Sequence, residues 1–278
     1  MLTSGRNEGG GERTMSAPTA IPYDSFIAEF YDYIPTVTVR RDLDFYLSGA
    51  REYGDPILEL GCGTGRVLLP LAREGSNVAG LDISEAMLAR CREKLAGEKD
   101  EVRRRVQLQC GDMTDFDLDV TFRLIIIPFR PFQHLLEVEQ QLSCLRRAHR
   151  HLSPGGRLIL DVFQTDAQRI HDPAFLKETP PLREINLPDG RKLVQTERTA
   201  AFHRAEQRND VELIHYIKHP DGRQERLVFA FTLRYFFRFE VEHLLARTGF
   251  RVAELYGDFD RSPLLDDSPE MLFVAEKI

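Results

Sequence analysis

The feature that most constrains the fold is a glycine-rich turn, Gly-Cys-Gly-Thr-Gly at residues 61–65, which directly follows the apolar run 56–60. A short apolar run bounded by turn residues predicts a buried strand, and residues 67–73 show the pattern of a helix. Glycine allows the backbone to approach a ligand closely and to adopt dihedral angles that a side chain forbids. A strand, a glycine turn and a helix in this order favour an open α/β sheet with a ligand at the turn.

The alternation of strand-like and helical segments continues to residue 163. We expect strands at 56–60, 77–81, 106–110, 122–127 and 157–163, with helices between most of them. The run 122–127 is nearly all apolar, as expected for a strand that is buried on both faces. Alternation at this spacing predicts a doubly wound α/β fold, in which helices cover both faces of a mostly parallel sheet.

The pattern changes after residue 163. Between residues 182 and 236 the sequence has no helical period, and strand-like runs alternate with Pro-Asp-Gly turns at 188–190 and 220–222. Such turns join neighbouring antiparallel strands. This segment therefore predicts an antiparallel β insertion of three or four strands.

The chain closes with a helix expected over 239–248 and two strands expected over 250–256 and 270–276. The two strands are too close in sequence for a helical crossover, so they should pair as an antiparallel hairpin. Together with the five earlier strands, they predict a seven-stranded, mostly parallel sheet with a C-terminal antiparallel hairpin.

Composition limits the classes of partner. The net charge is −7, and an acidic surface repels phosphate backbones, so no nucleic-acid partner is expected. No apolar stretch approaches the roughly 20 residues of a membrane span. The cysteines Cys62, Cys91, Cys110 and Cys144 form no CxxC pair and match no zinc spacing. We therefore expect no metal site, no membrane association, and reduced thiols in a cytoplasmic protein.

The spacing of the glycines distinguishes between two kinds of cofactor. In a dinucleotide site the third glycine would stand at position 66, which is Arg66, and Glu59 precedes the first glycine. A pyrophosphate requires exposed amides without a nearby carboxylate. A ligand that carries an ammonium and a sulfonium group can instead use that acid.

The segment from Glu59 to Gly65 resembles motif I of the class I SAM-dependent methyltransferases, of the small-molecule type. The resemblance extends in order over residues 23–163 and the C-terminal hairpin, and it implies S-adenosylmethionine (SAM) as cofactor and S-adenosylhomocysteine as product. Asp82 matches the family acid that accepts hydrogen bonds from both ribose hydroxyls, since a diol offers two donors and a carboxylate two acceptors. It lies about 20 residues past the first glycine, as one βαβ step requires.

The resemblance assigns further roles around the adenine and the methionine part of the cofactor. Ile83 would pack on the adenine face, Asp112 would accept from the adenine amino group, and the Met113 amide would contact a ring nitrogen. Pro128 and Phe129 match the stretch beside the methionine part. Apart from the resemblance, we expect an aromatic lid that includes Tyr31, because aromatic faces stabilise a sulfonium cation and exclude water. The expected cofactor-binding residues are Tyr31, Glu59, Gly61, Cys62, Gly63, Gly65, Asp82, Ile83, Asp112, Met113, Pro128 and Phe129.

Each acid also has an ordinary explanation when it is taken alone. Glu59 fits a solvated strand end, Asp82 a helix cap, and Asp112 a turn former. The lid aromatics fit core packing, and Arg40 fits either a partner for the cofactor carboxylate or a surface salt bridge. The order of the acids at successive strand ends favours one shared cofactor site.

His134, after the fourth strand, is the candidate catalytic residue. A sulfonium methyl is already activated, so the enzyme mainly supplies proximity and orientation, worth about 7–11 kcal/mol. A neutral amine or an alcohol would benefit from a nearby base. Some small-molecule N-methyltransferases, including those of amino sugars, resemble this sequence in placing a histidine there. The alternative is that His134 stands at a helix start and forms a hydrogen bond with the backbone. Both the catalytic and the structural interpretation stay open.

We therefore expect a SAM-dependent transfer of a methyl group to a nitrogen or oxygen of a small molecule. The alternatives are a non-catalytic SAM-binding regulator and an NAD-linked oxidoreductase. The expected domains are a disordered extension over 1–20, a SAM-binding domain over 21–163 and 237–278, and the insertion over 164–236. The insertion is expected to cover the substrate or to mediate dimerisation, which leaves a homodimer open.

Overall fold

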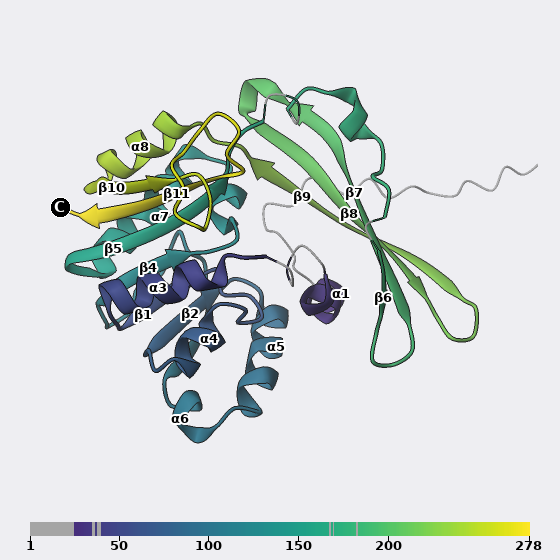
Figure 1. Ribbon diagram of the computed structural model, residues 1–278, viewed down its shortest axis with the longest axis horizontal. Coiled ribbons are helices and arrows are strands. Elements are labelled where there is room, and N and C mark those ends of the chain that lie inside the picture. The colour runs from purple at the N-terminus through teal and green to yellow at the C-terminus, as the bar shows by residue number, and fades with distance from the viewer. Residues whose placement is uncertain (1–24, 35–36, 38–39, 167, 169, 182) are drawn as a thin grey trace, which may run out of the picture.

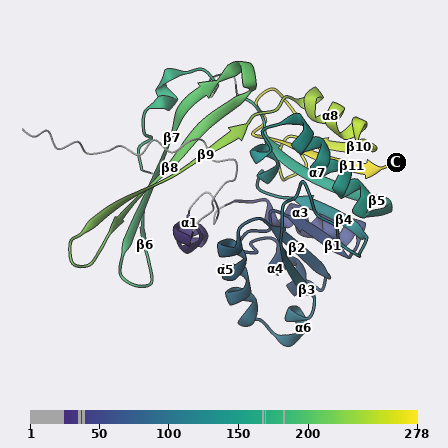
Figure 2. The same cartoon turned by 180° about the vertical axis from the view of Figure 1, so that it is seen from behind.

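The computed structural model describes residues 25–278 except 35–36, 38–39, 167, 169 and 182 (Figure 1). Residues 1–20, for which we expect a disordered extension, lie outside the described residues. The described chain forms two sheets. The larger is covered by helices, and the smaller extends to one side of it (Figure 2).

The larger sheet contains seven strands. They are β1 (Ile57–Leu60), β2 (Val78–Asp82), β3 (Val106–Cys110), β4 (Phe122–Ile127), β5 (Leu152–Phe163), β10 (Phe250–Tyr256) and β11 (Glu270–Lys277). Their order is β10-β11-β5-β4-β1-β2-β3. Neighbours among β1 to β5 pair in parallel, whereas β11 is antiparallel to both β5 and β10. The mostly parallel seven-stranded sheet and its terminal hairpin are therefore confirmed.

One strand boundary differs from the prediction by more than one residue. We expected the fifth strand to begin at residue 157, but β5 begins at Leu152. The reason is that Leu152 already pairs with Phe122 of β4. The register then shifts, so that the next paired residues are Leu124 and Arg157.

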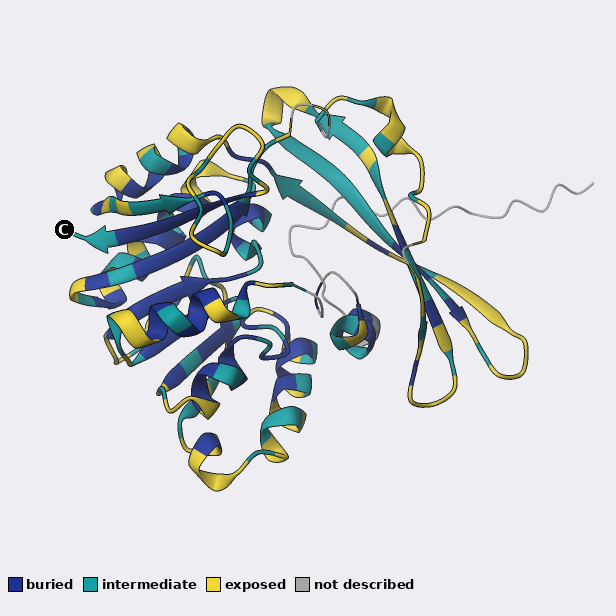
Figure 3. Ribbon diagram, viewed as in Figure 1, coloured by how far each residue is buried: buried dark blue, intermediate teal, exposed yellow. Residues whose placement is uncertain are grey.

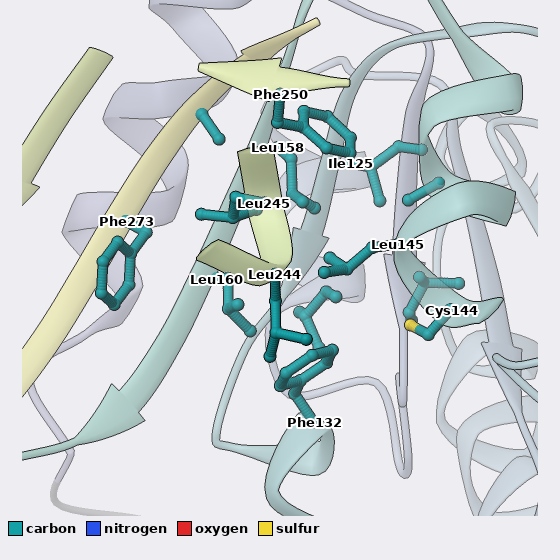
Figure 4. Close-up of a cluster of buried hydrophobic side chains, with 14 of the residues drawn as sticks. Ile125, Phe132, Cys144, Leu145, Leu158, Leu160, Leu244, Leu245, Phe250 and Phe273 are labelled. Carbon is teal, nitrogen blue, oxygen red and sulfur yellow. The ribbon is translucent and has the colours of Figure 1, made fainter. Parts of the chain in front are cut away.

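Helices cover both faces of this sheet. They are α3 (Leu43–Tyr53), α4 (Leu68–Arg73), α5 (Glu85–Ala96) and α6 (Asp100–Arg103) on one face, and α7 (Val138–His151) and α8 (Arg238–Arg247) on the other. Along β4, Ile125 and Ile127 pack with α7 and α8, whereas Leu124 and Ile126 pack with α3 and α4. Figure 4 shows the first of these clusters, and Figure 3 shows the buried strands between the helices. The apolar run therefore serves two cores, as its sequence predicted.

Pro70 lies inside α4, where helix propensity disfavours proline. The helix begins at Leu68, so Pro70 stands in its first turn. Backbone N–H groups there have no partner within the helix, and proline is tolerated because it lacks one.

The smaller sheet, which we call the cap sheet, consists of β6 (Glu184–Asn186), β7 (Lys192–His203), β8 (Arg208–Lys218) and β9 (Gln224–Arg234). All of its neighbouring strands pair antiparallel, which confirms the predicted insertion. It packs on α1 (Ser25–Phe30), where Phe30 contacts a cluster that includes Leu193 and Ile217. The division of the chain into domains stays a prediction. The 3-10 turns of the described chain are η1 (Tyr31–Tyr33), η2 (Pro131–His134), η3 (Pro173–Leu176) and η4 (Arg204–Glu206).

Gly80 of β2 provides a test of this packing. A Cβ atom at Gly80 would lie 2.4 Å from Leu68 Cδ1 and 2.7 Å from Cys62 Sγ. Gly80→Ala should therefore overpack the contact between β2 and α4 and reduce the free energy of unfolding by about 1–3 kcal/mol. Denaturant titration would measure the loss. At Gly97 the nearest atom, Lys94 O, is 3.4 Å away, so Gly97→Ala should be neutral or slightly stabilising. Equal losses in the two variants would contradict this explanation.

Candidate active site

A cavity opens at the carboxyl ends of β1, β2 and β4, the edge at which open α/β sheets bind ligands. Every residue predicted to contact the cofactor lines this cavity except Gly65, and so does His134. The lining residues that we did not predict are Thr64, Arg66, Val67, Leu81, Met87, Gly111, Pro131, Leu135 and Gln140.

The glycine turn docks on the end of β2. The amides of Gly61 and Cys62 both donate to Leu81 O, at 2.8 and 3.1 Å. Gly61, Gly63 and Gly65 have φ values of 75°, 52° and 81°, in the left-handed region that favours glycine. Gly65 faces away from the cavity, since a Cβ atom there would lie 2.6 Å from Cys91 Sγ of α5. A glycine is required at position 65 because of the close packing of α5 and the left-handed backbone conformation.

Asp82 joins the glycine turn to the start of α5. Its Oδ2 accepts from the Gly63 amide at 2.7 Å, and its Oδ1 accepts from the Ser84 amide at 2.8 Å. The side-chain cap of α5 is Ser84, whose Oγ accepts from the Met87 amide, so Asp82 is not the helix cap. Burial raises the pKa of Asp82, although both backbone amides oppose that effect. Each carboxylate oxygen keeps a further lone pair that can accept a hydrogen bond.

Glu59 is buried rather than solvated, with 2% of its surface exposed. Its Oε2 atom has no hydrogen-bond partner among the described residues, although it belongs to a side chain that lines the cavity. Burial raises the pKa of Glu59 well above its usual value, Arg66 lowers it, and Asp82 and Asp42 raise it further. The site therefore holds an acid that lacks a cationic partner of its own.

Arg66 supplies the positive charge at the cavity wall. Its two terminal nitrogens donate to the two oxygens of Asp42, both at 2.6 Å. The guanidinium lies 5.4 Å from the centre of the Phe129 ring, within cation–π range. The sequence signal for Arg66 is its place directly after the glycine turn, which argues against a dinucleotide but does not by itself indicate a cofactor contact.

Phe129 and Arg130 form a strained turn between β4 and η2. Both have left-handed backbones, with φ values of 66° and 68°, which side chains adopt at a cost. Arg40 lies on the Phe129 ring at 5.0 Å, but it does not line the cavity. It is not a surface residue either, because it forms an internal ion network with Asp42 and Asp161, at 2.8 and 2.9 Å. Neither explanation offered for Arg40 from the sequence describes this position.

The N-terminal aromatics divide between core and cavity. Phe30 is buried against the cap sheet, whereas Tyr31 lines the cavity with its ring 6.4 Å from that of Phe129. Asp32 anchors η1, since it accepts from Thr64 Oγ1 at 2.6 Å and from Lys94 Nζ at 3.0 Å. The segment is thereby held on the glycine turn and on α5.

The cavity lining also includes Ile83, Asp112 and Met113, from the loops after β2 and β3. Ile83 is 50% exposed, which is unusual for a large apolar side chain beside a cavity. Asp112 does form a turn, because its Oδ1 accepts from the Thr114 amide at 2.7 Å. Its other oxygen is available to a ligand. An apolar surface beside a hydrogen-bond acceptor suits a flat heterocycle with an amino group.

His134 is the last residue of η2 and lies half-buried between the cavity and the cap sheet. It forms a hydrogen bond with the backbone of Thr232, and its ring lies 5.4 Å from that of Phe231, both in β9. Burial lowers the pKa of His134 to about 4. The histidine therefore bonds the backbone and lines the cavity at once, and its ring is neutral at neutral pH.

The described part of the chain contains no cluster of metal ligands. Among these residues no group of three or more His, Cys, Asp or Glu side chains is placed to hold a metal ion. In the same part of the chain, no helix has the length and apolar character needed to cross a membrane.

Comparison with known proteins places this geometry in a family. Residues 57–156 match the family model of a methyltransferase domain. The chain is 29% identical over 266 residues to the cypemycin N-terminal methyltransferase of a Streptomyces species, covering 95% of this chain and 100% of that protein.

Solved structures agree with this match. The CcbJ methyltransferase from Streptomyces caelestis superimposes with a TM-score of 0.70 at 25% identity, over 90% of this chain and 96% of that one. The glycopeptide N-methyltransferase MtfA, solved with SAM, superimposes with a TM-score of 0.53 at 26% identity, over 84% and 94%. With the glycine turn, the acid at the end of β2 and the seven-stranded sheet, these similarities identify the chain as a class I SAM-dependent methyltransferase.

Proposed function

We propose that this enzyme methylates a nitrogen atom of a small-molecule amine and that His134 accepts the proton. The observation that carries the proposal is the position of His134, which lines the same cavity as Glu59 and Asp82 and is held there by its contact with β9. The names of the cypemycin N-terminal methyltransferase and of MtfA, which both specify nitrogen, support the same choice of acceptor atom.

The residues of the cavity fit SAM at each of its parts. The free lone pairs of Asp82 suit the ribose diol, while Ile83 and Asp112 suit the adenine ring and its amino group. At the other end, Glu59 has an unpartnered oxygen for an ammonium, and Arg66 offers a cation for a carboxylate. When bound, SAM supplies a sulfonium methyl that is ready for in-line displacement.

The chain's own residues then orient the acceptor and exclude water. The rings of Tyr31 and Phe129 form an aromatic wall that favours a sulfonium cation over bulk solvent. His134 holds the acceptor N–H at its ring and takes the proton that the amine loses. Its contact with β9 fixes the ring, so no reorganisation is needed when the charge develops.

The enzyme's setting is a further part of the proposal. Four free cysteines, Cys62, Cys91, Cys110 and Cys144, favour a reducing compartment, and we propose the cytoplasm. We also propose a homodimer, which size-exclusion chromatography with light scattering would test.

The direct test of the function compares amine acceptors with their hydroxyl analogues. Short peptides with a free N-terminus and amino sugars would be incubated with SAM, and S-adenosylhomocysteine would be quantified. We expect product only with the amines. Product only with the hydroxyl analogues would overturn the nitrogen assignment. SAM binding without turnover on any acceptor of the panel would favour the regulator over the enzyme.

The ribose assignment predicts the effect of Asp82→Ala. Loss of the carboxylate should weaken SAM binding at least about tenfold, equivalent to 1.4 kcal/mol, because the diol loses both acceptors. Isothermal calorimetry would measure the affinity. Asp119→Ala is the control, since Asp119 is exposed and does not line the cavity. Unchanged affinity in a folded Asp82→Ala variant would remove Asp82 from the cofactor site.

Glu59→Gln should have opposite effects on stability and on binding. Because the pKa of Glu59 is raised in the folded protein, folding favours the protonated acid. Its contribution to stability is complete below the ordinary pKa of about 4.3 and is lost as the pH rises through the folded pKa. The glutamine variant should therefore gain stability over wild type as the pH rises, yet bind SAM at least about tenfold more weakly.

Melting temperatures across pH 5 to 8 and calorimetry would check both effects. Glu101→Gln, at an exposed position, serves as the control. A stability difference between Glu59→Gln and wild type that stays constant with pH would argue against a buried titrating acid.

His134→Ala should lower kcat about a hundredfold or more and leave the affinity for SAM intact. Because the pKa of His134 is about 4, its proton-accepting form is complete above that pH and is lost below it. Any fall in rate between pH 5 and 8 should then persist in the variant, since it reports the ammonium form of the acceptor. Steady-state kinetics would decide, with the exposed His243→Ala as control. Undiminished turnover in His134→Ala would exclude the histidine from the mechanism.

A further inference from the structure

Gln133, directly before His134, is fully buried and uses both ends of its side-chain amide. Its Nε2 donates to Arg234 O at 2.8 Å, and its Oε1 accepts from the Phe163 amide at 3.2 Å. Phe163 is the last residue of β5, and Arg234 is the last residue of β9. One side chain therefore ties η2 to the larger sheet and to the cap sheet.

The segment that Gln133 holds is short and strained. The chain enters η2 through the left-handed pair Phe129 and Arg130, and such conformations cost about 1–3 kcal/mol each unless the surroundings enforce them. Pro131, the first residue of η2, is pressed against the glycine turn, since a Cβ atom at Gly61 would lie 2.7 Å from its Cγ. Local sequence preference does not favour this path, so tertiary contacts must maintain it.

Gln133 adds directional hydrogen bonds to the other contacts of η2, which are the ring contact of His134 with β9 and the apolar packing of Phe132. Phe132 is buried, with its ring 5.6 Å from that of Phe236. This apolar contact holds η2 against the core but, because it is not directional, it constrains the rotation of η2 only weakly. Hydrogen bonds are directional, and a buried amide bonded at both ends resists displacement because each broken bond leaves a desolvated polar group. Arg234 reinforces the junction by donating to Leu136 O at 3.1 Å.

We propose that Gln133 is a positioning residue for methyl transfer, which holds His134 at the acceptor end of the cavity by fixing η2 against both sheets. The proposal rests on the proposed role of His134. Gln133 does not line the cavity, so it acts through the histidine rather than on the substrate.

The principal test is Gln133→Leu, which keeps the bulk of the side chain and removes both hydrogen bonds. We expect kcat to fall about tenfold or more because the histidine is misplaced, whereas the Kd for SAM should stay within about twofold. In NMR titrations the pKa of His134 should rise from about 4 toward the ordinary value of about 6.5 as water reaches the ring.

A matched control is available in Gln164, which follows β5. Its Nε2 donates to the carbonyl oxygens of Leu265 and Asp266, at 3.0 and 2.7 Å, and so ties the end of β5 to a loop instead of to η2. Gln164→Leu should lower stability but leave kcat and the His134 titration unchanged. Equal effects of the two variants on kcat and on the titration would reduce Gln133 to an ordinary structural residue.

Two further measurements separate this proposal from the proposed function. If Gln133 acts through the histidine, adding Gln133→Leu to His134→Ala should change kcat by less than about twofold. If His134→Ala alone retains full turnover, the proposed base fails, but the NMR titration of Gln133→Leu still tests the positioning.

The isosteric Gln133→Glu variant covers the case in which Gln133→Leu does not fold. Its neutral form keeps an acceptor for the Phe163 amide and a donor for Arg234 O, so we expect it to retain most of the wild-type kcat. An unchanged His134 titration and kcat in folded Gln133→Leu would overturn the proposal. If only the glutamate variant folds, a kcat that does not fall as its carboxyl group ionises would do the same, because the ionised side chain no longer donates to Arg234 O.

Discussion

The site depends on an ion network buried beneath the cavity, centred on Arg40. Its guanidinium contacts carboxylates from three parts of the chain: Asp42 before α3, Asp161 of β5 and Glu270 of β11. Tyr46 of α3 also donates to Asp161, at 2.8 Å. Removing one partner from a buried network leaves an uncompensated charge, which typically costs about 3–5 kcal/mol. The network therefore sets the relative positions of the elements that carry the cavity.

The strained turn after β4 follows from this network. Phe129 lies beside the guanidinium groups of both Arg40 and Arg66, and Arg130 pairs with Glu270. These contacts hold the two left-handed residues in place. The turn that these residues form positions η2 at the cavity. The same ions thus support the Phe129 wall of the cavity and, through η2, the position of His134.

How much of this site the sequence predicts depends on how far apart in the chain the interacting residues lie. Strand periodicity and the glycine spacing are local signals, and they suffice to place Asp82 and Glu59 at neighbouring strand ends. The network of Arg40 with Asp161, and the contact of His134 with β9, join residues far apart in the chain, and no local pattern records them. At Gly65 the sequence predicted the right residue for the wrong reason. The glycine fits the motif, but it is needed because Cys91 packs against it, which only the structure reveals.

The proposed base is supported by a different sheet from the residues proposed to bind SAM. The residues proposed to bind SAM belong to the larger sheet, its loops and η1, whereas His134, the proposed base, contacts Phe231 and Thr232 of the cap sheet, which do not themselves line the cavity. Substitutions in β9 can therefore shift His134 without contacting the residues proposed to bind SAM. Because Gln133 joins β9 to β5, such changes are confined by the requirement that η2 keep its place between the two sheets.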